Sequence, residues 1–297
     1  MRALVTGGAG FIGSNLVDTL IRLGHEVVVI DNESAVVHEQ FYWNDKASNH
    51  KEDICDFDRV RPLFENVDVV FHLAARSRIQ LSLQNPTKTV MVNTYGTCNV
   101  LQCAREAGVN RVIYSSTSSA YGLTDPPHSE DGETDCLNPY SISKVSGERL
   151  CKMYTDLFGL DTVIFRYFNV YGNRHPLKGQ YAPVIGLFQK QKSEGKPLTI
   201  VPDGEQRRDF THVTDVVNAN ILASTAELES YGELFNIGSG VNHSILDLCD
   251  MISDDRVLIE PRPAEARETL ADISKARQLL GWSPKIQLED WINDNIR

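Results

Sequence analysis

The sequence predicts an α/β protein built as a doubly wound parallel sheet with a smaller mixed α/β lobe. Short apolar runs typical of buried strands alternate with stretches of helical periodicity through the first half of the chain. A glycine-rich turn, residues 7–13, joins the first of these runs to the first helical stretch. With 297 residues, the chain is long enough to hold a second lobe beside one sheet domain.

Residues 3–31 predict a strand, a helix and a second strand. The first strand covers residues 3–6, which are apolar or β-branched. The helix follows the turn and stops before Gly24, because apolar residues recur at helical spacing: Ile12, Leu16, Leu20 and Leu23. The second strand covers residues 27–30 and ends on Asp31. This order is that of a βαβ unit.

The turn between this first strand and helix has the composition of a dinucleotide-binding loop. Glycines permit a tight turn, allow backbone N–H groups to approach a pyrophosphate and let the helix pack close to the strand. Asp31 follows Gly13 by 18 residues, near the separation at which a carboxylate meets the adenosine ribose hydroxyls. Because Asp31 repels a 2′-phosphate and Asn32 rather than an arginine follows it, the pattern predicts NAD rather than NADP.

Charge and hydropathy argue against several classes of function. The formal net charge is −11 at pH 7, which disfavours nucleic acid or an anionic membrane as the main partner. No apolar run approaches the roughly 20 residues of a membrane span, and no secretory leader precedes the first strand, so we expect a cytoplasmic protein. The six cysteines show no metal-ligand spacing, and no metal site is expected.

Three more buried strands are expected to extend the sheet. They cover residues 67–71, 111–115 and 162–166, and the last of these is expected to be the final strand of the main sheet. Small residues follow the first of the three, where a cofactor could come close. A helix is expected from Thr87 to Ala107, and it contains Asn93, a polar side chain in a largely apolar stretch.

Hydroxyl and basic side chains gather after the second of these three strands. Residues 116–122 are a hydroxyl-rich run at the carboxyl end of a parallel strand, the edge at which α/β sheets bind ligands. Asn138 and Pro139 then start a helix as N-cap and first residue. Tyr140 and Lys144, four residues apart, lie on one face of that helix. Such a pair is common on solvated helices, but its place after a dinucleotide unit favours a catalytic role.

The second half of the chain is less regular. A helix and then a short strand over residues 197–201 are expected. The adjacent cations Arg207 and Arg208 lie either on a solvated face or against a diphosphate, and Arg262, between two prolines, is a second candidate for a diphosphate. Residues 32–50 also allow two interpretations: a loop or short helix over the cofactor edge, or a plain surface loop.

Motifs along the chain, together with Asp31 and Asn93, resemble the extended short-chain dehydrogenase/reductase family. Within it they are most similar to NAD-dependent nucleotide-sugar epimerases, particularly UDP-glucose and UDP-N-acetylglucosamine 4-epimerases. The motifs span nearly the whole chain: TGGAGFIG, HLAA, SSTSSAYG, YSISK, RYFNVYG, RRDFTHVTDV and LADISKARQLLGW. The resemblance implies a Rossmann-type NAD-binding domain over residues 1–170, with segments near 207–237 returning to it, and a substrate-binding lobe mainly over 171–297.

The resemblance also implies a reaction and the residues that carry it. Tyr140 acts as general base and acid, Lys144 binds the nicotinamide ribose and Thr117 bonds the sugar 4-oxygen. Hydride leaves C4 for NAD and returns to the other face of a 4-keto intermediate, so C4 is inverted and NAD stays bound. A nearby ammonium and the nicotinamide are expected to lower the pKa of the Tyr140 phenol towards operating pH.

The other site residues implied by the resemblance fall into two groups. The cofactor-binding group contains Gly7, Gly10, Phe11, Ile12, Gly13, Asp31, Asn32, Asp53, Ile54, Leu73, Ala74, Ala75, Arg76, Asn93, Ser115 and Phe168, besides Tyr140 and Lys144. The substrate-binding group holds a UDP-sugar and contains Thr117, Tyr140, Asn169, Ile200, Val201, Arg208, Arg262 and Thr269. The resemblance further implies a homodimer that pairs the helix after Thr87 with the helix of Tyr140.

Two serines bear on the type of reaction. The dehydratases of the family carry Asp and Glu directly after the active-site threonine, and the UDP-glucuronate decarboxylases carry a Glu there. Ser118 and Ser119 stand at these positions and do not ionise at neutral pH, which favours 4-epimerisation over dehydration or decarboxylation. A second alternative, a non-catalytic NAD-binding regulator, needs no base and is disfavoured by the intact Thr117, Tyr140 and Lys144.

Three other positions bear on the identity of the sugar. Thr269 stands where strict UDP-galactose-type members of the family have a tyrosine, so we expect N-acetylhexosamines to be accepted as well as hexoses. Arg76 and Arg78 stand where relatives mostly carry smaller or apolar residues around the sugar, which indicates that an acidic sugar is another option.

Overall fold

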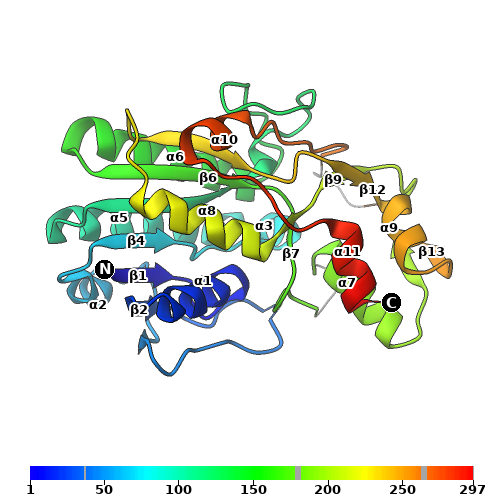
Figure 1. Cartoon of the computed structure of the whole chain (residues 1–297), viewed down its shortest axis with the longest axis horizontal. Coiled ribbons are helices and arrows are strands. Elements are labelled where there is room, and N and C mark those ends of the chain that lie inside the picture. The colour runs from blue at the N-terminus through cyan, green and yellow to red at the C-terminus, as the bar shows by residue number, and fades with distance from the viewer. Residues whose placement is uncertain (37, 178–181, 262–265, 297) are drawn as a thin grey trace.

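A seven-stranded parallel sheet forms the centre of the protein. The computed structural model describes residues 1–36, 38–177, 182–261 and 266–296. The sheet has the order β11-β6-β5-β4-β1-β2-β3 (Figure 1). Its strands are β1 (Arg2–Thr6), β2 (Glu26–Ile30), β3 (Ser48–His50), β4 (Val69–His72), β5 (Arg111–Thr117), β6 (Asp161–Tyr167) and β11 (Glu233–Ile237). The strand order reverses between β1 and β4, so a crevice for ligands is expected at the carboxyl ends of these two strands.

Helices cover both faces of this sheet, as expected for a doubly wound fold. One face carries α1 (Phe11–Arg22), α8 (Val213–Thr225) and α10 (Ser274–Leu280), whose apolar side chains join one core cluster. The opposite face carries α2 (Phe57–Val60), η1 (Arg61–Phe64), α5 (Gly96–Ala107) and α6 (Pro139–Phe158), which join a second cluster. The near-continuous apolar strands are explained by this burial on both faces.

The helix expected from Thr87 to Ala107 is interrupted. It consists of α4 (Pro86–Val90), a π-helical turn η2 (Met91–Tyr95) and α5, and a further helix, α3 (Ile79–Gln84), precedes it. Asn93 lies in the π-helical turn and is fully buried. Single π-turns inside α-helices often mark functional positions, and here the turn directs a polar side chain towards the loop that follows β4.

The smaller lobe is built from the later part of the chain. It contains α7 (Val184–Ser193), α9 (Ile245–Ile252), α11 (Leu288–Asn295) and three two-stranded pairings: β7 (Val170–Tyr171) with β10 (Thr211–His212), β8 (Leu198–Ile200) with β13 (Arg256–Leu258), and β9 (Arg207–Asp209) with β12 (Asn242–Ser244). A third apolar cluster fills it. In Figure 1 the lobe lies beyond one end of the large sheet.

Three features of the sheet differ from the expectations. The strand predicted over 162–166 is not the last of the main sheet, because β11 returns and pairs in parallel with β6. The short strand β3 falls inside the segment 32–50 that was expected to be a loop or short helix. The helix α10 also packs on the sheet, although it lies beyond the segments near 207–237 that were expected to return to it. None of the helices among the described residues is long and apolar enough to cross a membrane.

Candidate active site

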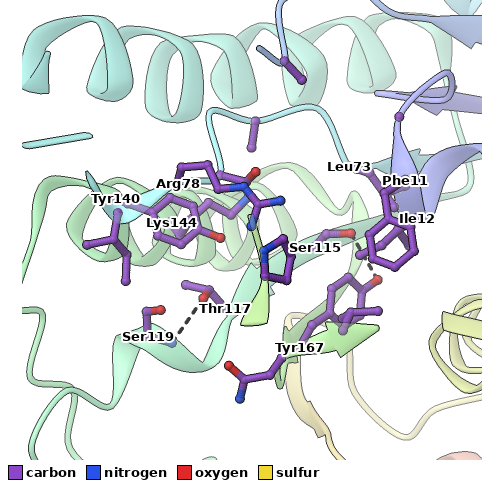
Figure 2. A pocket seen from close by; sticks show the side chains of 18 of the residues that line it. Phe11, Ile12, Leu73, Arg78, Ser115, Thr117, Ser119, Tyr140, Lys144 and Tyr167 are labelled. Atoms are coloured by element: carbon purple, nitrogen blue, oxygen red, sulfur yellow. Dashed lines mark hydrogen bonds between the residues drawn. The ribbon is translucent and has the colours of Figure 1, made fainter. Parts of the chain in front are cut away.

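A cavity of about 490 Å³ opens at the carboxyl edge of the sheet, between the sheet and the smaller lobe. One end of its lining is the glycine turn after β1, and the other is the hydroxyl run after β5, which includes a short 3₁₀ helix, η3 (Ser118–Ala120). Lobe residues such as Val184 and Ile245 close its outer side. Figure 2 shows side chains from several elements pointing into this one space.

The glycine turn brings backbone to the cavity without side chains. Gly7 has φ +70°, a conformation that L side chains rarely adopt, and a Cβ at Gly13 would lie 2.1 Å from the Gly7 carbonyl oxygen. The helix α1 starts at Phe11 with no side-chain cap, so its first N–H groups face the cavity. Gly7, Gly10, Phe11, Ile12 and Gly13 all line it. The turn therefore fits the pyrophosphate of a dinucleotide.

Asp31 stands at the end of β2 with its carboxylate at the cavity wall. Its oxygens accept hydrogen bonds from the backbone N–H groups of Ala9, at 3.1 Å, and Glu33, at 2.8 Å. Burial raises the pKa of Asp31, and these backbone donors oppose the rise. Next to it, the Asn32 amide donates to Asp53 at 2.9 Å. A carboxylate and an amide thus form the end of the cavity where ribose hydroxyls are expected.

The loop after β4 forms the next part of the wall. Leu73, Ala74 and Ala75 line the cavity, which is consistent with the prediction that small residues allow a close approach. The loop is held from behind by Asn93, whose amide accepts from the Arg76 N–H at 2.7 Å and donates to the Arg76 carbonyl at 3.1 Å. Asn93 also donates to the Ser143 hydroxyl of α6 at 2.9 Å. One buried amide therefore ties this loop to the helix that carries Tyr140.

Tyr140 and Lys144 reach the cavity because of where α6 begins. Asn138 caps the helix, with its side chain accepting from the Ser141 N–H at 2.9 Å in a capping box, and Pro139 occupies the first turn. Both predicted start signals are confirmed. Tyr140 and Lys144, one turn apart, line the cavity opposite Thr117 at the end of β5 (Figure 2).

The protein environment shifts the pKa of both side chains. Burial raises the pKa of Tyr140, and a hydrogen bond with Thr117 and the charge of Arg78 act in the opposite direction. The lowering expected from the sequence is therefore outweighed, in the protein alone, by desolvation. Burial lowers the pKa of Lys144 to about 7, and its ammonium lies 4.2 Å from the centre of the Tyr114 ring. Lys144 is thus close to titration at neutral pH.

The substrate side of the cavity is formed by the segment after β6 and by the lobe. Asn169 has φ +27°, and its amide donates to the Asp209 carbonyl at 2.8 Å and to the Thr269 hydroxyl at 3.2 Å. Asn169, Val201, Arg208 and Thr269 all line the cavity. Arg262, the other expected diphosphate ligand, lies outside the described residues.

Five of the expected site residues that the structure describes do not line the cavity. Phe168 is fully buried in the core against Tyr121 and His128. Ile200 faces the lobe core because strand residues alternate, so its neighbours Thr199 and Val201 line the cavity instead. The other three lie behind the wall: Asp53, Arg76 and Asn93. Asp53 accepts a hydrogen bond from Asn32, which lines the cavity, and Asn93 holds the loop after β4 from behind, so both residues act as supports of the site.

Several lining residues were not singled out from the sequence. His38 and Phe41 come from the segment 32–50, which therefore lies against the cavity and is not only a surface loop. Pro183, Val184 and Leu187, at the start of α7, and Ile245 come from the lobe. No local pattern marks these apolar residues, because only the packing of the lobe onto the sheet edge brings them to the site.

The fold and the site together define a dinucleotide-binding α/β enzyme scaffold, with a hydroxyl, a phenol and an amine gathered beside the cofactor cradle. The chain belongs to the NAD dependent epimerase/dehydratase family, whose family model matches residues 3–238. NAD is the cofactor of this family, and solved neighbours contain it.

Similar proteins narrow the range of reactions without fixing one. The UDP-glucose 4-epimerase of Mycolicibacterium smegmatis is 37% identical over 308 residues, covering 100% of this chain and 97% of the relative. The UDP-glucuronate 4-epimerase of Thermodesulfobacterium geofontis is 35% identical, covering 99% and 96%. The UDP-glucose 4-epimerase of Thermotoga maritima, solved with UDP-glucose, superposes with a TM-score of 0.94 at 34% identity, covering 100% and 97%. UDP-sugar decarboxylases at 34% identity are also among the relatives.

Proposed function

We propose that this protein inverts the configuration at C4 of a UDP-linked sugar. One observation carries the proposal: Thr117, Tyr140 and Lys144 meet in the cavity beside a backbone cradle for NAD, and uncharged serines occupy the two positions after Thr117. Inversion at C4 requires a group that takes up and returns one proton, whereas elimination and decarboxylation call for further acid or base groups. NAD, when bound, supplies the hydride-accepting and hydride-donating chemistry at C4.

The side chains of the site divide the work of proton transfer. The Tyr140 side chain acts as a phenolate, which takes the proton of the sugar 4-hydroxyl to become the phenol and returns that proton later in the cycle. The Lys144 ammonium, when protonated, stabilises the phenolate form of Tyr140, and its pKa of about 7 keeps both of its states populated at neutral pH. The Thr117 hydroxyl, which also accepts from the Ser119 N–H at 3.1 Å, orients the reacting oxygen.

The choice between an epimerase and a decarboxylase rests on Ser118 and Ser119. The relatives include both kinds of enzyme. In this chain Ser118 and Ser119 line the cavity next to Thr117, and the carboxylates among the described lining residues, Asp31 and Glu52, belong to the opposite, adenosine end. The site therefore lacks the extra ionisable group that a decarboxylase or a dehydratase needs. A purely regulatory NAD-binding role would not explain why Thr117, Tyr140 and Lys144 meet in the cavity.

The nucleotide sugar is proposed to lie across the lobe side of the cavity. Arg208, Thr199 and Val201 line this side, and we propose that Arg208 binds the diphosphate and that Thr199 and Val201 hold the uracil ring. Thr269, a small side chain bound to Asn169, leaves room for an N-acetyl group. We therefore propose that N-acetylhexosamines are accepted besides hexoses, and that the part of the chain from residue 171 onwards supplies most of this substrate lobe.

The test uses purified protein with no added cofactor. It is incubated in turn with UDP-glucose, UDP-N-acetylglucosamine and UDP-glucuronate, and the C4 configuration and the carboxylate are followed by NMR. We expect the galacto isomers to form, with no loss of carboxylate. Tyr140→Phe should reduce turnover by at least about 100-fold, the low end of what a general acid–base group contributes, while the content of bound NAD is unchanged.

Two outcomes contradict the proposal. Loss of carbon dioxide from UDP-glucuronate would show that the protein is a decarboxylase. If NAD-loaded protein inverts none of the three sugars, the result would favour a non-catalytic NAD-binding regulator. Full turnover by Tyr140→Phe would show that another group moves the proton.

A further inference from the structure

Arg78 is a cation inside the cavity that neither the cofactor cradle nor the proposed chemistry uses. It lies in the loop between β4 and α3 and lines the cavity, whereas Arg76, two residues earlier, does not. Its Nε atom is buried and has no hydrogen-bond partner among the residues that the structure describes. Figure 2 shows its guanidinium pointing into the space beside Tyr140 and Lys144. A buried guanidinium donor without an acceptor is costly, so an acceptor on a ligand is expected.

The charges around Arg78 make this end of the cavity positive. Lys144 lies at the same end, and among the described lining residues no carboxylate lies there, because Asp31 and Glu52 belong to the adenosine end. The ion pairs formed by the described residues do not include Arg78. The site is therefore suited to a ligand with negative charge close to Tyr140.

Neither diphosphate is the natural partner of this guanidinium. The dinucleotide pyrophosphate is provided for by the backbone of Gly7 to Gly13 and the start of α1. The diphosphate of the nucleotide sugar is provided for by Arg208 on the lobe side. Arg78 instead interacts electrostatically with Tyr140, the side chain that meets the reacting carbon under the proposed function.

We infer that Arg78 binds a carboxylate on the sugar ring and that the preferred substrate is a nucleotide-linked uronic acid. This inference rests on the proposed function, since it takes Tyr140 to mark the position of the sugar. A guanidinium and a carboxylate form paired, charge-assisted hydrogen bonds, which a neutral hydroxymethyl group cannot replace. The carboxylate of a uronic acid is at C6 and an acetamido group is at C2, so this selection is compatible with the space left by Thr269.

The experiment compares binding and turnover in the NAD-loaded protein. Dissociation constants for UDP-glucuronate and UDP-glucose are measured by calorimetry in the Tyr140→Phe background, with and without Arg78→Gln. We expect Arg78→Gln to weaken the binding of UDP-glucuronate by about 10- to 150-fold, the usual range for a hydrogen bond to a charged group. The binding of UDP-glucose should weaken far less. Arg149→Gln, which removes an exposed cation from the same helix as Tyr140, is the matched control and should change neither constant.

Three other results would contradict either the carboxylate site at Arg78 or the proposed function. If Arg78→Gln weakens the binding of both UDP-sugars equally, or if the variant loses NAD, Arg78 binds the diphosphate or the cofactor, and the inference is overturned. Wild-type protein that inverts UDP-glucose with a higher kcat/KM than UDP-glucuronate would overturn it too and leave the proposed function intact. If no sugar is inverted but Arg78→Gln selectively loses UDP-glucuronate, the proposed function fails and the carboxylate site stands.

Discussion

Single buried side chains set the electrostatics of the site, and Lys144 is the clearest case. It is almost fully buried, and burial lowers its pKa from the ordinary 10.5 to about 7. Contact with the Tyr114 ring offsets only part of the cost of burying the ammonium. A residue kept at this cost in the core of a helix–sheet interface is expected to serve function more than stability.

The depressed pKa of Lys144 predicts a pH-dependent stability in the NAD-free protein. Below pH 7 the amine is charged both folded and unfolded, so its full burial penalty is present. Between pH 7 and 10.5 the folded protein has lost the proton that the unfolded chain keeps, so stability contributed by this group rises with pH. Lys144→Met should therefore raise the Tm above that of the wild type at pH 6, and the difference should shrink at pH 9.

Calorimetry at the two pH values checks this prediction. Lys152→Met, at an exposed position of the same helix, is the control, and its Tm difference from wild type should be the same at both pH values. A Tm difference for Lys144→Met that is larger at pH 9 than at pH 6 would contradict the assignment.

At the scale of elements, a buried ion pair ties α6 to the two strands beneath the catalytic group. Glu148 of α6 accepts from Arg166 of β6 through two bonds, at 2.9 and 2.7 Å, and from the Ser116 hydroxyl of β5 at 2.5 Å. The Arg166 side chain is 3% exposed and that of Glu148 9%. Tyr140 projects from this helix and Thr117 from the end of β5, so the pair fixes the distance between them.

Glu148→Gln should destabilise the protein strongly, because it leaves the Arg166 guanidinium buried without a carboxylate to balance its charge. We expect a loss of about 3–5 kcal/mol in the free energy of unfolding, measured by urea denaturation. Asp250→Asn removes one partner of the exposed pair with Arg256 and should cost less than about 1 kcal/mol. Equal losses in the free energy of unfolding for the two variants would mean that the buried pair contributes no more to stability than the exposed pair.

The elements also show how far sequence patterns reach. The first βαβ unit, the start of α6 and the strand β5, which ends at Thr117, were predictable, because each is specified by local apolar spacing or capping residues. The π-helical turn around Asn93 was not, since its apolar spacing resembles that of an ordinary helix. The return of β11 to the sheet depends on pairing with β6, which no local pattern encodes.

At the scale of the whole molecule, the position of the lobe determines which lobe residues line the cavity, and most of these were not predicted. Most of the lining residues that local motifs marked, such as Asp31, Thr117 and Tyr140, come from the sheet side of the cavity, and Arg208 comes from the lobe side. Those contributed by α7 and Ile245 depend on how the lobe packs onto the sheet edge, and no local pattern shows that they face the cavity. Sequence therefore predicted the cofactor side of the cavity better than the substrate side.

The outer surface of the helices beside α6 suggests how two copies could assemble, and we propose a homodimer through it. Large apolar side chains are exposed on neighbouring segments that pack against α6 and on α6 itself: Leu83, Val90, Met91, Tyr95 and Ile142. Tyr95 is 52% exposed and Ile142 51%. Exposed apolar side chains on neighbouring segments are typical of a protein–protein interface, and pairing these segments with those of a second copy about a two-fold axis would bury the side chains on both subunits.

Tyr95→Glu is expected to separate this dimer, because it places a charge at the centre of an apolar contact. Size-exclusion chromatography with light scattering should give twice the 33.2 kDa chain mass for the wild type and the chain mass for the variant. Leu123→Glu, at an exposed apolar position in a loop after β5, should remain dimeric. A monomeric wild type at micromolar concentration, or a dimeric Tyr95→Glu, would refute the assignment. Pairing along the outer face of α6, which carries Tyr140 and Lys144, would also stabilise this helix. The monomeric Tyr95→Glu variant should therefore have a lower Tm than the dimeric wild type.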